Sequence, residues 1–156
     1  MNDKLFDAIR NGDLEMVKAI TIAHPELVNI KDTRGSTPLL LSTYYGNQDI
    51  TEALLKQNPA INAQDGSGNT ALMGVCFKGY AVIAKLLIDQ GADVNAVNHN
   101  NATALIYAAT FAQGEIAQLL VDNGANITHK DEKGNTAYDH AKMQGATKLM
   151  EILKAE

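Results

Sequence analysis

The sequence is poor in several residue types, and each shortage argues against a class of protein. Its single cysteine, Cys76, has no partner for an internal disulfide, so nothing points to an oxidising compartment. Basic residues number 13 against 18 acidic ones, and this net charge of −5 does not supply the basic surface that nucleic acid requires. No apolar run approaches the roughly 20 residues that cross a bilayer. We therefore expect no nucleic-acid partner and no membrane segment.

The N-terminal stretch is not expected to be a signal peptide. Residues 1–20 carry charges throughout and have no apolar core of the kind that a signal peptide needs. The composition, 46% hydrophobic and 20% charged over 156 residues, is that of a globular protein long enough for one substantial domain. We expect a single domain, residues 1–156, in a monomeric cytoplasmic protein.

Residues that could carry catalysis or hold a metal are few and scattered. The four histidines stand at no metal-ligand spacing: His24, His99, His129 and His140. Cys76 falls within an expected helix, which favours a small buried thiol over a nucleophile. The glycine-rich stretch 66–70 lacks the Lys-Ser/Thr end of a phosphate-binding loop. We predict no enzymatic activity, no metal and no cofactor.

What the sequence has is a repeat of 33 residues, centred on residues 65–97. Shifting the sequence by this period places like residues on one another at many positions. The clearest aligned sets are Gly35, Gly68, Asn101 and Gly134, then Thr37, Thr70, Thr103 and Thr136, then Leu39, Leu72, Leu105 and Tyr138. A fixed period of this length is typical of stacked supersecondary units.

The chemistry of the central repeat predicts two helices and a projecting loop. Residues 65–69 form a turn cluster, and Thr70 can cap a helix that runs to Lys78 and stops at Gly79. A second helix should then bury one apolar stripe made of Val82, Ile83, Leu86 and Leu87.

Two helix ends depart from this pattern. Ala112 replaces the helix-ending glycine in the fourth repeat, and we expect the nearby Gly114 to shift that turn. After the second helix of the second repeat, Asn58-Pro59 replaces Gly-Ala. Asn tolerates the left-handed conformation but a following proline restricts it, so this turn is also expected to differ.

These motifs resemble the ankyrin repeat. The matching segments are DTRGSTPLL, DGSGNTAL, GADVNA and GANI, and the resemblance extends from Leu5 to Leu153. It implies an all-α ankyrin-repeat solenoid of five helix-turn-helix units with β-hairpin-like projecting loops. The units are an N-terminal cap, three full repeats and a C-terminal cap, at residues 1–31, 32–64, 65–97, 98–130 and 131–156.

The resemblance also implies where a partner binds, because the family forms one concave surface from the loop tips and the exposed face of each first helix. At the helix ends, the corresponding residues are Tyr44, Tyr45, Phe77, Lys78, Thr110 and Phe111. At the loop tips they are Thr33, Arg34, Ser36, Ser67, Asn69, His99, Asn100, Glu132 and Lys133, with Ala102 and Asn135 beside them. The tips are mostly small and uncharged, which suits recognition by hydrogen bonds and shape.

Four of the eight aromatic residues fall at these helix ends, namely Tyr44, Tyr45, Phe77 and Phe111. They either pack between repeats or anchor a partner, and we expect at least two to be exposed. The favoured function is a non-enzymatic module that binds a protein through its concave surface. The alternative is a receptor for a small polar ligand or glycan that stacks on these rings, which a deep cavity would favour.

Overall fold

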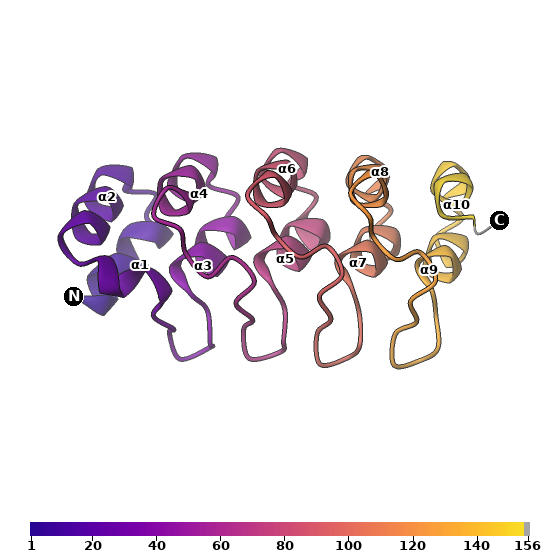
Figure 1. Ribbon diagram of the computed structural model, residues 1–156, viewed down its shortest axis with the longest axis horizontal. Coiled ribbons are helices and arrows are strands. Elements are labelled where there is room, and N and C mark those ends of the chain that lie inside the picture. Colours follow the sequence, from indigo (N-terminus) through magenta and orange to yellow (C-terminus); the bar gives the residue numbers. More distant parts are fainter. Residues whose placement is uncertain (155–156) are drawn as a thin grey trace.

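The computed structural model describes residues 1–154 and shows ten α-helices in five pairs that follow one another in a single row (Figure 1). The inner helices, next to the loops, are α1 (Asn2–Arg10), α3 (Pro38–Tyr44), α5 (Ala71–Lys78), α7 (Ala104–Thr110) and α9 (Ala137–Met143). The outer helices are α2 (Leu14–Ala23), α4 (Gln48–Leu55), α6 (Ala81–Asp89), α8 (Gly114–Asp122) and α10 (Thr147–Leu153). A short 3₁₀ helix, η1 (Pro25–Asn29), follows α2.

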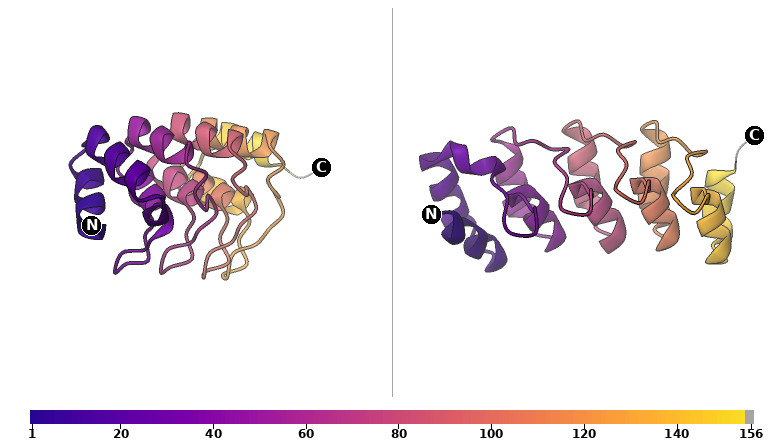
Figure 2. Two further views of the ribbon diagram at one scale, coloured as in Figure 1. Left: turned by 60° about the vertical axis from the view of Figure 1, so that its left-hand side comes forward. Right: turned by 90° about the horizontal axis from the view of Figure 1, so that it is seen from below.

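The overall shape is an elongated array with the two chain ends at opposite ends of the row (Figures 1 and 2). No residue between 1 and 154 forms a β-strand. The prediction of an all-α helix-turn-helix solenoid is confirmed. Each range predicted for a unit holds one helix pair, except that residues 155 and 156 of unit 5 lie outside the described part of the chain.

The inner helices begin where the threonines predict. Thr37, Thr70, Thr103 and Thr136 each accept a hydrogen bond from the backbone N–H three residues later, as in the 3.3 Å bond from Met73 N–H to Thr70 Oγ1. Such a cap satisfies a donor that the first turn leaves unpaired. Helix α5 ends at Gly79 with a left-handed φ of 82°.

At the two unusual helix ends the backbone keeps the left-handed φ that glycines have in the other units. The turn at Asn58 nevertheless differs, as expected, because Pro59 has no N–H for the bond that Ala92 and Ala125 donate to Leu87 O and Leu120 O. Ala112 takes a left-handed φ of 55°, and Asn58 takes 51°. Helix α8 still begins at Gly114, the position equivalent to Ala81 at the start of α6. The expected shift of the turn at Ala112 was therefore wrong, because the neighbouring units fix the position of both helices and the alanine adopts the strained backbone that results.

The core runs between the helix pairs. Inner helices pack on inner helices and outer on outer, and the larger apolar cluster is continuous from α3 to α10. Cys76 is completely buried in this cluster, and burial raises the pKa of its thiol above the ordinary value. It is therefore a core residue, as predicted, and is held protonated.

Two positions differ from the predicted burial. Val82 is exposed on α6, whereas Ile83, Ala84 and Leu87 form the buried stripe. Residues 83, 84 and 87 share one helix face, and position 82 precedes that face and points to solvent. Ala102, expected at a loop tip, is buried, because its backbone pairs with Asn98 at the base of the loop.

The four loops all project to the same side of the row (Figures 1 and 2). Each is closed by a side chain at its first position, and in unit 3 the Oδ1 atom of Asp65 accepts hydrogen bonds from Ser67 N–H at 2.8 Å and Asn69 N–H at 3.0 Å. The equivalent residues are Asp32, Asn98 and Asp131. These turns are narrow, as a β-hairpin is, but the backbone forms no strand.

Neighbouring loops are joined by backbone hydrogen bonds near their tips. Gly66 N–H donates to Arg34 O at 3.2 Å, His99 N–H donates to Ser67 O at 3.1 Å, and Glu132 N–H donates to Asn100 O at 3.0 Å. These bonds link all four loops into one strip. The loop tips are thus positioned by one another as well as by their own turns.

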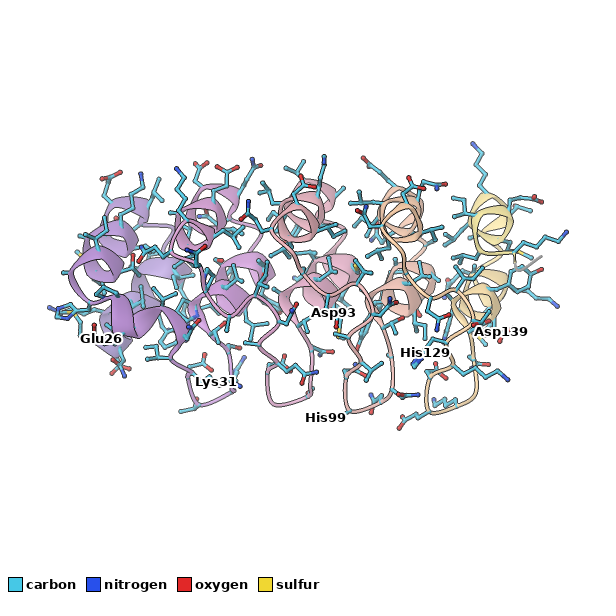
Figure 3. The ribbon with its side chains drawn as sticks, viewed as in Figure 1. Glu26, Lys31, Asp93, His99, His129 and Asp139 are labelled. Atoms are coloured by element: carbon cyan, nitrogen blue, oxygen red, sulfur yellow. The ribbon has the colours of Figure 1, made fainter. Side chains whose placement is uncertain are left out.

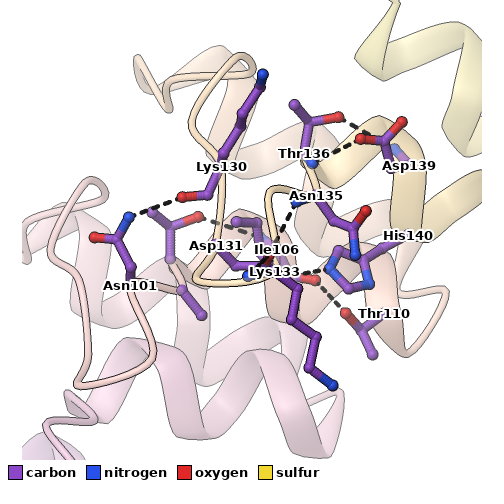
Figure 4. A network of polar contacts seen from close by, with 12 residues as sticks. Asn101, Ile106, Thr110, Lys130, Asp131, Lys133, Asn135, Thr136, Asp139 and His140 are labelled. Carbon is purple, nitrogen blue, oxygen red and sulfur yellow. Dashed lines mark hydrogen bonds and ion pairs between the residues drawn. The ribbon is translucent and has the colours of Figure 1, made fainter.

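A network of polar contacts joins the last loop to helix α9 (Figure 4). His140 on α9 lies 2.7 Å from Asp131, measured from Nε2 to Oδ2. Burial alone would raise the pKa of Asp131. The pKa is nevertheless held below the ordinary value of 3.8 by the hydrogen bond from His140, by the N–H groups of Asn135 and Lys133, and by the charge of His140. The N–H of Thr136 is the main cause of a similar lowering of the pKa of Asp139.

These two carboxylates predict a loss of stability in acid. A carboxylate whose pKa is lower in the folded state stabilises the fold above its unfolded-state pKa, and that stability is lost as the pH falls through the folded-state value. We expect the urea midpoint of the protein to fall between about pH 5 and pH 2, and to fall less in Asp131→Asn. The Asn98 turn shows that asparagine closes the same loop. Equal acid dependence of the two proteins would contradict this assignment.

Candidate functional site

The ends of the inner helices present aromatic side chains to solvent. Tyr44 is 52% exposed, Tyr45 49%, Phe77 46% and Phe111 43%. Tyr44 is the last residue of α3, and Tyr45 and Phe111 are the residues directly after α3 and α7. All four rings are exposed, where at least two were expected. We call these four residues the aromatic row.

The rings of the aromatic row contact one another in pairs. Tyr44 and Tyr45 meet edge to face with centroids 5.5 Å apart, and Phe77 meets Phe111 of the next unit in the same way at 4.7 Å. Between the pairs, Lys78 Nζ lies 4.5 Å from the centroid of the Tyr44 ring. Edge-to-face and cation–π contacts of this kind hold exposed rings in place and so lower the entropy that binding would cost.

Beside the aromatic row lies a groove of about 810 Å³, here called the unit-3 groove. The residues that line it include Tyr44 and Phe77 of the aromatic row, Gly74 on α5, and Arg34 and Asp65 of the neighbouring loops. Tyr107 of unit 4 also lines it. The groove is open to solvent and is not an enclosed cavity.

The predicted loop-tip residues divide into two groups by exposure. Thr33, Arg34, Ser67, His99, Asn100, Glu132 and Lys133 are exposed, as is Lys78 on α5. Figure 3 shows His99 at the tip of its loop. Ser36, Asn69 and Thr110 are half-buried. We call the exposed tips, together with the aromatic row and Lys78, the loop-side surface.

Two of the half-buried residues have structural bonds of their own. Thr110 Oγ1 donates to the carbonyl of Ile106 at 2.7 Å within α7. Asn69 Oδ1 accepts from Asn98 Nδ2 at 2.9 Å and from the Tyr107 hydroxyl at 3.3 Å. Their polar groups are therefore less available to a partner than those of the exposed tips.

Two residues that support the site were not predicted from the sequence: Tyr107, which lines the unit-3 groove, and Asn98, which is bonded to it. Asn98 is buried, and its Nδ2 also donates to the Tyr107 hydroxyl at 2.9 Å. The signal was present in the repeat, because Asn98 stands where the other three loops have aspartate. An amide supplies a donor that a carboxylate lacks, and a hydroxyl nine residues later accepts it.

Within residues 1–154, no three His, Cys, Asp or Glu side chains are arranged to hold a metal ion. In the same part of the chain, no helix has the length and apolar character to cross a membrane. The features that do converge are exposed rings, hydrogen-bonding loop tips and the unit-3 groove.

The fold and this surface together define a class: a solenoid of short helix pairs whose loops and inner helices share one exposed side. The chain matches the family model described as ankyrin repeats (3 copies) over two overlapping stretches, residues 5–98 and 83–156. It belongs to the ankyrin repeat family, whose members generally act as non-enzymatic protein–protein interaction modules.

Proposed function

We propose that this protein is a non-enzymatic module that binds one protein partner on its loop-side surface. The observation that carries the proposal is the aromatic row, in which four rings at equivalent ends of successive helices are all exposed. Aromatic residues are favoured as interface anchors because they bury much area with few rotatable bonds. A protein surface gains nothing from leaving a continuous row of them in water.

Rigidity supports the same proposal. The loops are linked tip to tip by backbone hydrogen bonds, and each turn is closed by its own aspartate or asparagine. A surface that is ordered before binding loses little conformational entropy when a partner arrives. An open surface of this kind can therefore hold a folded protein without any closing motion.

The charges of the surface suit short-range recognition. The predicted contact residues include three basic residues, Arg34, Lys78 and Lys133, and one acidic residue, Glu132. The whole chain has a net charge of −5. The remaining predicted contacts carry no charge when His99 is neutral. We propose that hydrogen bonds and fit, and not a long-range field, select the partner.

The test is the double variant Tyr45→Ala/Phe77→Ala. Partner capture from a native lysate of the source organism should fall at least about tenfold, because truncating a hot-spot residue costs about 2 kcal/mol or more. The free energy of unfolding should change by less than about 1 kcal/mol, because both rings are exposed.

The matched control is Ile22→Ala/Val82→Ala, which truncates two exposed apolar side chains on the outer helices α2 and α6. Capture should be unchanged in this control. Unchanged capture by Tyr45→Ala/Phe77→Ala would show that the aromatic row is not the interface.

The unit-3 groove supports a second candidate function, that of a receptor for a small polar ligand or glycan. Its volume of about 810 Å³ is of the size that such ligands occupy, and Tyr44, Tyr45 and Phe77 line it. Its openness favours the protein partner, because ligand pockets usually bury most of the ligand. Binding of a glycan on an array, lost in Tyr45→Ala/Phe77→Ala, would favour this candidate. The cytoplasmic location and monomeric state remain predictions.

A further inference from the structure

One of the residues that line the unit-3 groove is a glycine in the middle of a helix. Gly74 lies within α5, and a Cβ built on it meets no atom within 4 Å. The equivalent residues of units 2, 4 and 5 carry large side chains: Leu41, Tyr107 and His140. Glycine is unfavourable inside a helix, and here no neighbouring atom requires it. The space above Gly74 is therefore open where the other full repeats are filled.

The missing side chain also leaves a carboxylate oxygen of unit 3, which is not buried, without a donor from residues 1–154. In unit 4 the second polar atom of Asn98 bonds to the hydroxyl of Tyr107, nine residues on. In unit 5 the Oδ2 atom of Asp131 bonds in the same way to His140 (Figure 4). In unit 3 the residue nine positions after Asp65 is Gly74, which has nothing to donate. Oδ1 of Asp65 accepts two backbone N–H groups, and no donor in residues 1–154 reaches Oδ2.

Unit 2 shows which side chain suits such a carboxylate. There the position holds Leu41, which cannot donate, and Arg10 from the preceding unit brings Nη2 to 3.9 Å from Oδ2 of Asp32. A guanidinium therefore has room to approach the base of a loop from the groove side. It would also neutralise the charge, which a tyrosine hydroxyl cannot.

The positively charged side chains that surround the groove form no ion pair with Asp65 within residues 1–154. Arg10 is held by Asp7 at 3.1 Å as well as by Asp32, and Lys78 lies over the Tyr44 ring. The side chain of Arg34 is exposed at the neighbouring loop tip and forms no ion pair with Asp65 within the described residues. Tyr44 and Phe77 also line the groove, and an aromatic ring attracts a guanidinium placed over its face.

We infer that the unit-3 groove receives an arginine side chain of the protein partner, which fills the space above Gly74 and pairs with Oδ2 of Asp65. The inference rests on the proposed function and specifies the chemistry of the partner. The arginine would occupy the place that Tyr107 and His140 occupy in their own units.

The test recovers binding peptides from a random library, so it does not require the partner itself. A phage-displayed library of random peptides is selected on the immobilised protein, and the recovered peptides are synthesised with fluorescent labels. Kd values are measured by anisotropy for the wild type, Asp65→Asn and Gly74→Tyr. Asp65→Asn preserves the turn, as Asn98 does in unit 4, and Gly74→Tyr reproduces the unit-4 arrangement with Tyr107. The control, Asp89→Asn, removes a carboxylate from the outer helix α6.

The recovered peptides should share an arginine. Replacing it with citrulline, which has the same shape but no charge, and introducing Asp65→Asn should each weaken binding about tenfold or more. Gly74→Tyr should abolish binding, and Asp89→Asn should leave it unchanged. The citrulline peptide should bind the wild type and Asp65→Asn equally, because the pair is already broken.

Two other results overturn the inference and separate it from the proposed function. Peptides that need Tyr45 and Phe77 but lack an arginine, or bind Asp65→Asn equally well, would refute the arginine site and leave the loop-side interface standing. Recovered peptides that are insensitive to Tyr45→Ala/Phe77→Ala, Asp65→Asn and Gly74→Tyr would refute both.

Discussion

Leu72→Ala is expected to lower the free energy of unfolding by about 2–5 kcal/mol, the range for removing a buried leucine side chain. Leu72 is 1% exposed on α5 and lies in the apolar cluster that runs through units 2 to 5. The loss cannot stay within unit 3, because each unit is stable only while it is packed against its neighbours. Urea denaturation followed by circular dichroism measures the change.

The matched comparison is Phe77→Ala on the same helix. Phe77 touches Phe111 across the unit boundary, but its side chain is 46% exposed. Because of this exposure, its truncation should lower the free energy of unfolding by less than about 1 kcal/mol. The two variants remove large apolar side chains five residues apart on one helix. Equal losses would mean that the aromatic row belongs to the core, and the proposed interface would lose its main support.

The fold could be predicted from the sequence because its determinants are local and repeated. Thr70 caps α5 through a bond to a residue three positions away, and Gly79 ends the helix through its own backbone conformation. Both features depend on a few neighbouring residues, and the 33-residue period repeats this pattern of capping and helix-ending residues along the chain. The exposure of the aromatic row was predicted only in part, because the sequence left open whether the rings pack between repeats and indicated exposure for at least two of the four.

What the sequence did not reveal depends on contacts between units. Asn69 of unit 3 meets Asn98 and Tyr107 of unit 4 although up to 38 residues separate them. The repeat marks Asn98 as unusual, but it does not show that its side chain reaches Asn69. Gly74 looks like an ordinary weak point of a helix until the space above it is known to be empty. Ala112 shows the converse, since packing by the neighbouring units imposes a backbone conformation that its own preference opposes.

The stiffness of the loop strip predicts a large effect at a single glycine. Gly68 has a φ of 82°, and a Cβ there would lie 2.8 Å from the backbone nitrogen of His99 and 3.1 Å from the Cα of Asn98. The N–H of His99 donates to the carbonyl of Ser67 in the hydrogen bond that joins the loops of units 3 and 4. Gly68→Ala should therefore strain its own backbone by about 1–2 kcal/mol and add a clash of about 1–3 kcal/mol.

Gly134→Ala separates these two costs. Gly134 occupies the same position of the last described loop with the same φ of 82°, but a Cβ there meets no atom within 4 Å. It should show the backbone strain alone, so Gly68→Ala should be the less stable of the two in urea. Gly68→Ala should also speed amide exchange at His99, whose bond to the next loop is displaced. Equal losses of stability in Gly68→Ala and Gly134→Ala would show that the loop of unit 4 moves away from the added Cβ at little cost. A surface whose loops move so easily is not the preordered surface that the proposed binding function requires.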